Sequence, residues 1–300
     1  MRVLVTGASG FLGRHVVAEL GKRRHEVLRL TRGPLDPADP RLKRWDPDQA
    51  WIDPEALTGL DAVIHLAGES IAGARWNEAV KARLLDSRVR GTKVLVDALA
   101  SRSDRPKVLL AASAVGLYGE RGDEDLDESS PAGAGFLAEL CGRWESEAGR
   151  VTALGVREVR LRLGMVLGSE GGALRKMLPP FRLGLGGRLG SGRQWMSWIA
   201  MRDAVDATLF LMEREDASGP YNLCAPLPAT NAQFTQSLGR ALGRPARLPV
   251  PAFALRLAYG EMADALLLAG QKALPRRLKD AGFNWSQPYL GEALNHLVRT

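Results

Sequence analysis

The chain has 300 residues, of which 45% are hydrophobic and 25% are charged, and this composition excludes a disordered, collagen-like or disulfide-rich protein. Its two cysteines are too few for a metal cluster and suit a reducing compartment. No apolar run approaches the roughly 18 to 20 residues that a membrane helix needs, and the start MRVLVTG lacks the layout of a signal peptide. The sequence therefore predicts a soluble, cytoplasmic protein without a metal site.

The net charge of +7 comes from the second half of the chain. Residues 1–150 hold 22 basic and 23 acidic side chains, whereas residues 151–300 hold 19 and 11. Such a surplus fits an anionic partner, either a nucleic acid or a small molecule. A genome that favours arginine codons produces the same total without any partner, so both interpretations stay open at this point.

Strands and helices alternate through the first 165 residues. The β-branched run at 2–6 stops at a glycine, as a buried parallel strand does. Apolar residues between Phe11 and Arg24 recur at helical spacing. Further strands are expected at 26–31, 62–66, 107–112 and 155–163, with helices at about 76–100 and 134–153. This order predicts an α/β fold, namely a Rossmann-type doubly wound parallel sheet with helices on both faces.

The second half of the chain is less regular. Glycine and proline pairs between Gly171 and Gly192 indicate loops, and helices are expected again at about 202–214, 230–242, 251–271 and 290–298. We predict a nucleotide-binding domain over 1–165, with strand contributions from about 195–225. A substrate-side region over 166–247 and a small, mostly helical C-terminal domain over 248–300 follow it.

A glycine-rich segment joins the first strand to the first helix. Its three glycines would permit a tight turn, the close approach of backbone to a pyrophosphate, and close packing of helix on strand. The spacing is GxxGxxG rather than GxGxxG, but the strand before it and the helix after it are the context that a dinucleotide site needs. The predicted cofactor contacts here are Gly7, Ser9, Gly10, Phe11, Leu12 and Gly13.

The end of the second strand indicates which dinucleotide binds. An NAD site places Asp or Glu there to accept a hydrogen bond from the ribose 2′-hydroxyl, whereas this chain has Thr31 and Arg32. An acid would repel a 2′-phosphate, and a guanidinium pairs with it. The sequence therefore favours NADP(H), with a solvated arginine at a strand end as the alternative.

Several separate motifs resemble one known superfamily. The glycine-rich segment, the strand end His65-Leu-Ala-Gly68 and Trp198-Ile-Ala-Met-Arg-Asp203 look like the extended short-chain dehydrogenases/reductases. Ser113-Ala-Val-Gly-Leu-Tyr-Gly119 and Pro180-Phe-Arg-Leu-Gly-Leu-Gly-Gly187 narrow the resemblance to the atypical, sugar-nucleotide-epimerase-like subgroup of cell-division-inhibitor-like epimerase proteins. The resemblance covers nearly the whole chain, including the small C-terminal domain of that subgroup.

The resemblance implies further contacts. Toward the cofactor they are Asp46 near the adenine, Leu66, Ala67 and Gly68 at a strand end, Arg83 and Arg88 on the long helix, and Arg162 on the nicotinamide side. Toward the diphosphate of a small anionic substrate, such as a nucleotide sugar, they are Arg182, Arg188 and Arg193, whose guanidinium groups suit phosphate oxygens. A homodimer through the helices at 76–100 and 134–153 is implied by the same analogy. For each arginine, a solvated surface charge is the alternative.

The resemblance ends at the catalytic pair. Enzymes of the superfamily use a Tyr and a Lys four residues apart on one helix, so that the ammonium lowers the pKa of the phenol that exchanges a proton with substrate. None of the four tyrosines has a lysine at that distance, and counting by analogy puts Leu137 and Cys141 at the two positions. Ser113 and Tyr118 are the remaining candidates for proton transfer, with packed side chains as the alternative.

Two functions share this predicted cofactor site. One is an NADP-dependent oxidoreductase or epimerase that acts on an anionic, sugar-nucleotide-like substrate by hydride transfer. The other is a non-catalytic NADP(H)-binding sensor or regulatory protein. Neither a nucleic acid nor a membrane is expected as a partner.

Overall fold

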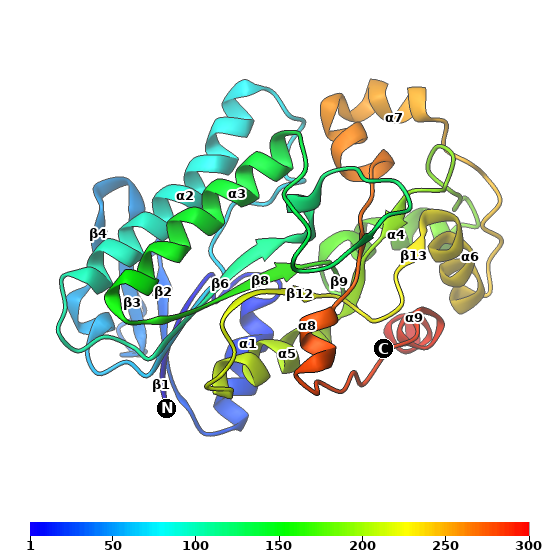
Figure 1. Cartoon of the computed structure of the whole chain (residues 1–300). Coiled ribbons are helices and arrows are strands. Elements are labelled where there is room, and N and C mark those ends of the chain that lie inside the picture. Colours follow the sequence, from blue (N-terminus) through cyan, green and yellow to red (C-terminus); the bar gives the residue numbers. More distant parts are fainter. Residues whose placement is uncertain (300) are drawn as a thin grey trace.

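A computed structural model describes residues 1–299 of the chain (Figure 1). The central sheet has eight strands in the order β12-β8-β6-β5-β1-β2-β3-β4. Neighbouring strands are parallel, with the exception of β3 and β4, which are antiparallel. The strands are β1 (Arg2–Thr6), β2 (Glu26–Thr31), β3 (Leu42–Asp46), β4 (Trp51–Ile52), β5 (Ala62–His65), β6 (Val108–Ala114), β8 (Arg157–Leu163) and β12 (Gly219–Leu223).

Helices cover both faces of this sheet. The helices α1 (Gly13–Lys22) and α5 (Met201–Glu213) lie on one face, and α2 (Glu78–Ala100) and α3 (Phe136–Gly149) lie on the other (Figure 1). Successive strand residues point to opposite faces, so Val3 and Val5 pack in the core under α1 and α5, whereas Leu4 packs in the core under α2. The predicted Rossmann-type sheet is confirmed.

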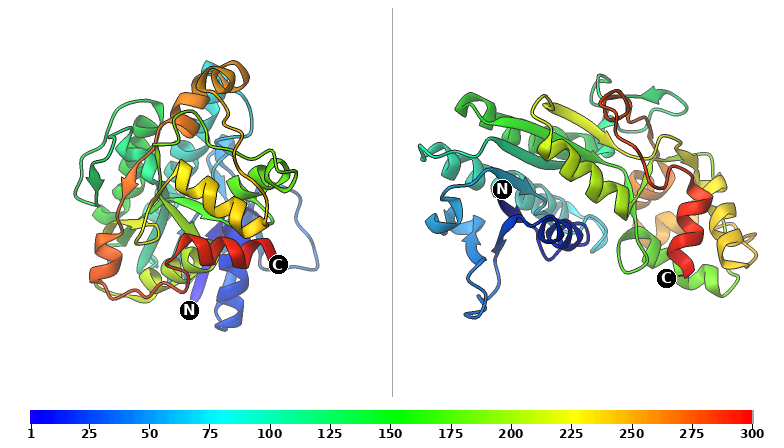
Figure 2. Two further views of the ribbon diagram at one scale, coloured as in Figure 1. Left: turned by 90° about the vertical axis from the view of Figure 1, so that its right-hand side faces the viewer. Right: turned by 90° about the horizontal axis from the view of Figure 1, so that it is seen from below.

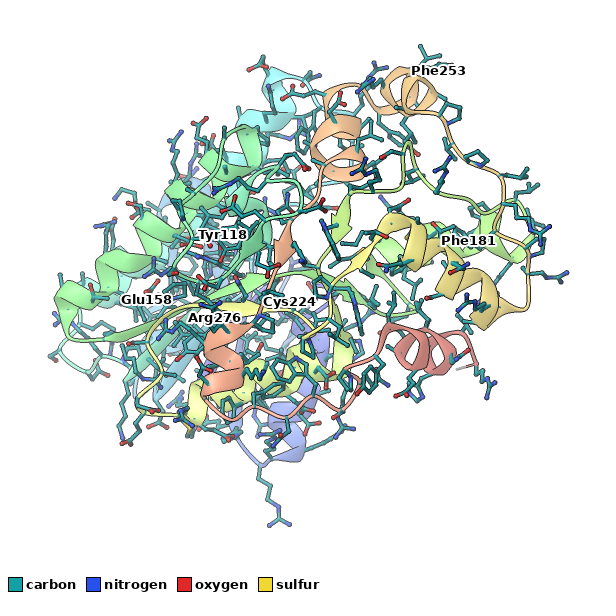
Figure 3. The ribbon with its side chains drawn as sticks, turned by 45° about the vertical axis from the view of Figure 1, so that its right-hand side comes forward. Tyr118, Glu158, Phe181, Cys224, Phe253 and Arg276 are labelled. Carbon is teal, nitrogen blue, oxygen red and sulfur yellow. The ribbon has the colours of Figure 1, made fainter. Side chains whose placement is uncertain are left out.

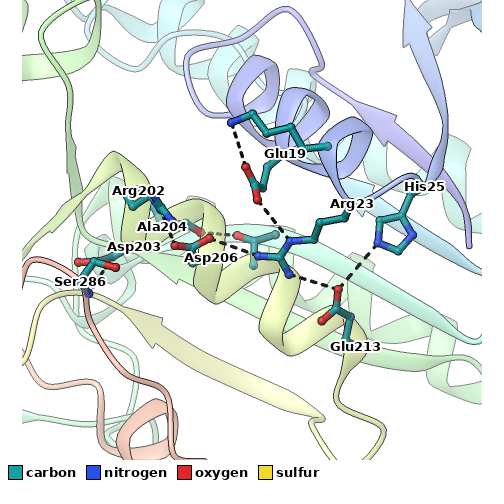
Figure 4. A network of polar contacts seen from close by, with 11 residues as sticks. Glu19, Arg23, His25, Arg202, Asp203, Ala204, Asp206, Glu213 and Ser286 are labelled. Atoms are coloured by element: carbon teal, nitrogen blue, oxygen red, sulfur yellow. Dashed lines mark hydrogen bonds and ion pairs between the residues drawn. The ribbon is translucent and has the colours of Figure 1, made fainter.

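Ion pairs hold α1 and α5 together at the rim of the sheet (Figure 4). The Arg23 guanidinium lies 3.4 Å from the Asp206 carboxylate and 3.3 Å from that of Glu213.

On α5, Asp203 is buried and accepts hydrogen bonds from the backbone N–H groups of Ser286 and Gln287 at 2.7 and 3.0 Å. The buried carboxylate therefore anchors the C-terminal segment to α5.

The helices α4 (Gly172–Arg182), α6 (Asn231–Leu242) and α9 (Leu290–Arg299) form a separate helical lobe with a core of its own. Figure 2 shows α6 and α9 at one end of the molecule and the β3–β4 edge of the sheet at the other. Helix α7 (Ala252–Tyr259) contacts the segment that follows it at 263–268, and α8 (Arg276–Asp280) lies beside β12. Short two-stranded pairs complete the chain: β7 (Asp125–Leu126) with β14 (Lys272–Ala273), β9 (Met165–Leu167) with β11 (Trp198–Ala200), and β10 (Trp195–Met196) with β13 (Ala229–Thr230).

The structure corrects two predicted elements. Residues 172–182 form helix α4 rather than a loop, because Leu174, Leu178 and Phe181 bury one face of it in the lobe core despite Pro179 and Pro180. The single helix predicted over 251–271 is wrong: α7 ends at Tyr259, Gly260 adopts φ 60°, and a π-helix follows over Ala263–Leu268. No helix within residues 1–299 is long and apolar enough to cross a membrane.

Candidate functional site

The glycine-rich segment forms a closely packed turn between β1 and α1. A Cβ on Gly7 would lie 2.7 Å from the Leu66 carbonyl carbon, and a Cβ on Gly13 would lie 2.1 Å from the Gly7 oxygen, so neither position accepts a side chain. The α1 N-terminus has no side-chain cap and no acid in its first turn. The N–H groups of Arg14, His15 and Val16 donate to the Gly10 and Leu12 carbonyls, so an anion such as a pyrophosphate would lie at the very start of this helix, against the backbone of the turn.

A second loop covers the glycine-rich segment. The Phe11 ring lies in a cradle of glycines, where a Cβ on Gly168, Gly171 or Gly172 would come within 2.8, 2.4 or 2.7 Å of it. From the same loop, one Glu170 carboxylate oxygen lies 2.6 Å from His15 Nε2, on α1. Leu12 is buried in the core, whereas Ser9 is exposed at the turn. The sequence motif did not reveal the Glu170 contact, because it joins segments 155 residues apart.

A buried hydrogen-bond chain supports the strand end next to this turn. Thr92 Oγ1 donates to the Arg88 carbonyl at 2.7 Å and lies 3.0 Å from His65 Nε2. His65 Nδ1 lies 2.7 Å from Thr6 Oγ1, which accepts the Ala67 N–H at 3.2 Å. A carbonyl only accepts, so the Thr92 hydroxyl accepts from the His65 Nε2–H. Burial keeps the imidazole neutral near pH 7, so its Nδ1 carries no proton and accepts from the Thr6 hydroxyl. Through these bonds His65 links β1, β5 and α2.

Burial lowers the pKa of His65 to about 4, below its ordinary value near 6.5. As the pH falls below about 6.5, the unfolded chain takes up a proton on His65 that the folded chain refuses until about pH 4, so stability is lost across this window. We expect the His65 contribution to shrink by about 3 kcal/mol between pH 7 and pH 4. Urea unfolding of the wild type and of His65→Gln at both pH values measures the difference in their free energies of unfolding. The same difference at pH 7 and at pH 4 would contradict the prediction.

The two candidates for the 2′-phosphate lie where β2 ends. Thr31 Oγ1 accepts the Gly33 N–H at 3.0 Å, which shapes the turn. Arg32 is exposed and forms no ion pair with any residue in the part of the chain that the structure describes. Asp46 caps the short 3₁₀ helix after β3 by accepting from Asp48 N–H and Gln49 N–H, so its side chain already has a local structural role.

The two arginines of α2 have different surroundings. The Arg88 guanidinium stacks on the Trp144 ring and donates to the Leu84 and Glu69 carbonyls at 3.0 and 2.9 Å. It also lies against Gly68, where a Cβ would come within 3.3 Å of it. Burial lowers the pKa of Arg88, and among the described residues the hydrogen bonds of its guanidinium go to carbonyl oxygens and not to a carboxylate. Arg83 instead forms a half-exposed ion pair with Glu69.

Ser113, Tyr118 and Arg162 belong to one buried polar network centred on Glu145 of α3. Arg162 Nε and Nη2 donate to the two Glu145 oxygens at 2.8 and 2.9 Å, and Ser113 donates to the first of them at 2.7 Å. Tyr118 accepts from Arg162 Nη1 at 2.9 Å and donates to Asn222 at 2.7 Å. Asn222 Nδ2 in turn donates to the Leu274 carbonyl, which links the network to the C-terminal segment.

This network argues against the predicted roles of its members. Tyr118, labelled in Figure 3, is fully buried, and burial raises its pKa to about 12, whereas an efficient acid or base has a pKa near the working pH. Ser113 and Arg162 are buried and bonded to the same carboxylate, so both side chains already have a structural role, and the contact of Arg162 on the nicotinamide side stays a prediction. Burial also raises the pKa of Cys141 to about 11, and Leu137 packs in the same apolar cluster as Cys141.

The structure places the three candidate substrate arginines on the helical lobe. Arg182 ends α4, Arg188 donates to the Ser191 carbonyl at 3.0 Å, and Arg193 follows two residues later. All three are exposed, and none is paired with the glycine-rich turn in the described part of the chain. Their predicted contact with an anionic substrate stays a prediction.

Two hollows lie away from the glycine-rich turn. One, of about 830 Å³, runs between α2 and α3, and Lys81 and Phe136 line it. The other, of about 470 Å³, borders the buried network at Glu145 and Arg162. Neither includes a residue of the turn, so the cofactor site rests on the turn itself and on the strand ends. No group of three His, Cys, Asp or Glu side chains is placed to hold a metal ion within residues 1–299.

Comparison with known proteins supports the same interpretation of the fold. The model of the NAD dependent epimerase/dehydratase family matches residues 3–224, and a domain of unknown function, DUF1731, matches residues 250–297. An epimerase family protein of Mycobacterium bovis, Mb2239, is 46% identical over 294 residues, which are 98% of this chain and 96% of that protein.

Two solved structures are similar over the whole length of this chain. The crystal structure of human epimerase family protein SDR39U1 with NADPH is 38% identical, with a TM-score of 0.92 and full coverage of both chains. A nucleoside-diphosphate sugar epimerase from Corynebacterium glutamicum is 34% identical, with a TM-score of 0.79, over 99% of this chain and 58% of that one. The fold, the glycine-rich turn and the family match together show that the chain belongs to the NAD dependent epimerase/dehydratase family.

Proposed function

We propose that the chain binds NADP(H) across the glycine-rich turn and acts on an anionic, sugar-nucleotide-like substrate by hydride transfer. The observation that carries the cofactor is the uncapped, acid-free N-terminus of α1 behind glycines that admit no side chain. Arg32 supplies the preference for the 2′-phosphate. The NADPH in the human relative and the sugar-nucleotide epimerase from Corynebacterium support the cofactor and the substrate class.

In this proposal the residues of the chain bind and orient the dinucleotide. The α1 N-terminus holds the pyrophosphate, and Arg32 binds the 2′-phosphate. Residues 66–68, at the strand end, contact the ribose, and the guanidinium of Arg88 places a buried positive charge behind Gly68. NADP(H) supplies or accepts the hydride when bound. Because Tyr118 and Ser113 are buried and bonded, the proton that accompanies the hydride comes from a group other than these two.

We expect Arg32→Ala to weaken NADPH binding about 10- to 100-fold, since a hydrogen bond to a charged group contributes about 1.5–3 kcal/mol. NADH lacks the 2′-phosphate, so its affinity should stay within about twofold. Titration of both dinucleotides by fluorescence or calorimetry measures the two effects. Lys22→Ala, at the other end of α1, is the matched control and should change neither affinity. Equal losses for NADPH and NADH would remove the 2′-phosphate contact from the proposal.

A second candidate function is a non-catalytic NADP(H) sensor, and the burial of Ser113 and Tyr118 favours it. The two functions separate in one experiment, in which the protein is loaded with NADPH or NADP⁺ and offered nucleotide sugars and small carbonyl compounds. Consumption or epimerisation of any of them supports the enzyme, and binding without turnover supports the sensor. If turnover occurs, Tyr118→Phe should keep it, because the phenol does not reach substrate; a loss of turnover in a folded variant would restore Tyr118 as the proton donor.

A further inference from the structure

Helix α7 exposes large apolar side chains to solvent. Helix α7 buries only Leu255, whereas Phe253 and Leu257 are 72% and 78% exposed. Being four residues apart, they share one face of the helix. Figure 3 shows Phe253 at the outer rim of the molecule, on α7. The rest of the chain that the structure describes therefore leaves the apolar face of α7 that carries Phe253 and Leu257 uncovered.

Neighbouring loop residues extend this surface. Segments 186–190 and 248–250 pair through backbone hydrogen bonds, from Leu248 N–H to the Gly186 carbonyl at 3.1 Å and from Val250 N–H to the Arg188 carbonyl at 2.9 Å. This pairing brings the segments that carry Leu185 and Leu248 next to each other just before α7. The exposed fractions of Leu183, Leu185 and Leu248 are 74%, 55% and 52%. We call Leu183, Leu185, Leu248, Phe253 and Leu257 the apolar ridge.

The two segments of the chain that carry the ridge contain no acidic side chain. Residues 171–202 and 217–260 contain ten basic side chains and no Asp or Glu. Of the ten, Arg202 and Arg256 form ion pairs, and both pair with acids outside these ranges. Arg240, Arg244 and Arg247, which lie just before Leu248 in the chain, are exposed and form no ion pair among residues 1–299. Arg247 adjoins Leu248 in the chain, and Pro245 lies 3.5 Å from the position of a Cβ on Gly184, so the segment that carries Arg244 and Arg247 lies against the segment that carries Leu183 and Leu185.

This combination matches the chemistry of an anionic membrane surface. An interfacial protein places Phe and Leu side chains at the boundary of headgroups and acyl chains, while nearby Arg and Lys side chains interact with anionic lipids. A nucleic acid would use the guanidinium groups and leave the aliphatic side chains of the ridge in water. Contiguous exposed apolar surface on a protein marks an interaction site.

We propose that the apolar ridge binds the surface of a membrane rich in anionic phospholipid, with Arg240, Arg244 and Arg247 on its headgroups. The sequence-based expectation of no membrane partner rested on the absence of a spanning segment, which an interfacial contact does not need. The proposal goes beyond the proposed function and does not depend on it, because the ridge and the glycine-rich turn share no residue.

Co-sedimentation of the full chain with vesicles tests this proposal. Vesicles of mixed phosphatidylglycerol and phosphatidylcholine should bind the protein, and binding should weaken with added salt and be far lower on phosphatidylcholine alone. The double variant Phe253→Ser with Leu257→Ser should lower the apparent partition coefficient onto the vesicles about tenfold or more. The double variant Arg244→Glu with Arg247→Glu should do the same. All four positions are exposed, so thermal unfolding should be unchanged.

Matched variants outside the lobe are Leu35→Ser and Lys107→Glu, both at exposed positions, and they should bind vesicles as the wild type does. No binding to anionic vesicles at low salt overturns the proposal. Binding that the charge reversals abolish and the serine variants leave intact also overturns it, because the surface would then recognise a polyanion such as a nucleic acid. Retained NADPH binding in all variants keeps this result separate from the test of the proposed function.

Discussion

Glu145→Ala should destabilise the protein by about 3–5 kcal/mol, because it leaves the buried Arg162 guanidinium without its carboxylate. The wild-type pair is bidentate, with nitrogen–oxygen distances of 2.8 and 2.9 Å, and Ser113 donates to the same carboxylate. In a protein of marginal stability this loss removes a large part of the free energy of unfolding. Chemical unfolding monitored by tryptophan fluorescence measures it.

Glu139→Ala is the matched control for this prediction. Glu139 lies on the same helix, its side chain is 65% exposed, and its contact with Arg143 is at 3.7 Å. Exposed pairs of this kind contribute little, so we expect a change of about 0.5 kcal/mol or less. If the two variants lose similar stability, the Glu145 network does not hold the fold together, and Ser113, Tyr118 and Arg162 return as candidates for chemistry.

Gly13→Ala should abolish measurable NADPH binding and lower stability by about 1–3 kcal/mol, the usual cost of inserting a methyl group where there is no room. The new Cβ would lie 2.1 Å from the Gly7 oxygen and 2.9 Å from its carbonyl carbon. Both are backbone atoms, so the turn itself must move away from the pyrophosphate position. Dinucleotide titration and thermal unfolding of the same preparation report the two effects.

Gly21→Ala tests the same substitution on the same helix without the clash. No atom lies within 4 Å of a Cβ built on Gly21, and alanine is favoured over glycine in a helix by about 1 kcal/mol. We therefore expect equal or greater stability and unchanged NADPH affinity. Retention of NADPH binding in Gly13→Ala would show that the cofactor does not depend on the close approach of α1 to the turn.

The sequence predicted the elements whose signal is local. Strand β1, the glycine-rich turn and α1 are adjacent in the chain, and each glycine there has a backbone reason that spacing reveals. The sequence also located the surplus of positive charge in residues 151–300 and showed that no Tyr and Lys stand four residues apart. These inferences needed no knowledge of which residues meet in space.

The roles of buried polar side chains were decided by tertiary contacts. Arg162, Ser113 and Tyr118 looked available from their motifs, and the structure bonds all three into one network because Glu145, 17 residues from Arg162, is brought beneath them. Helix α4 was missed for a related reason: the local cost of Pro179 and Pro180 is outweighed by the burial of Leu174, Leu178 and Phe181 against distant helices.

By itself, then, the sequence determined the α/β fold class, the dinucleotide turn and the charge of the second half, since these depend on periodicity, glycine geometry and counting. Only the tertiary structure decided which polar groups stay free. From sequence, any hydroxyl or guanidinium is a candidate for chemistry, because its burial and its hydrogen-bond partners are unknown. The partner of Tyr118, Asn222, is 104 residues away in the chain, so no local pattern reveals the bond. The same folding left the arginines of the helical lobe exposed beside an apolar ridge, which residue counts could not show.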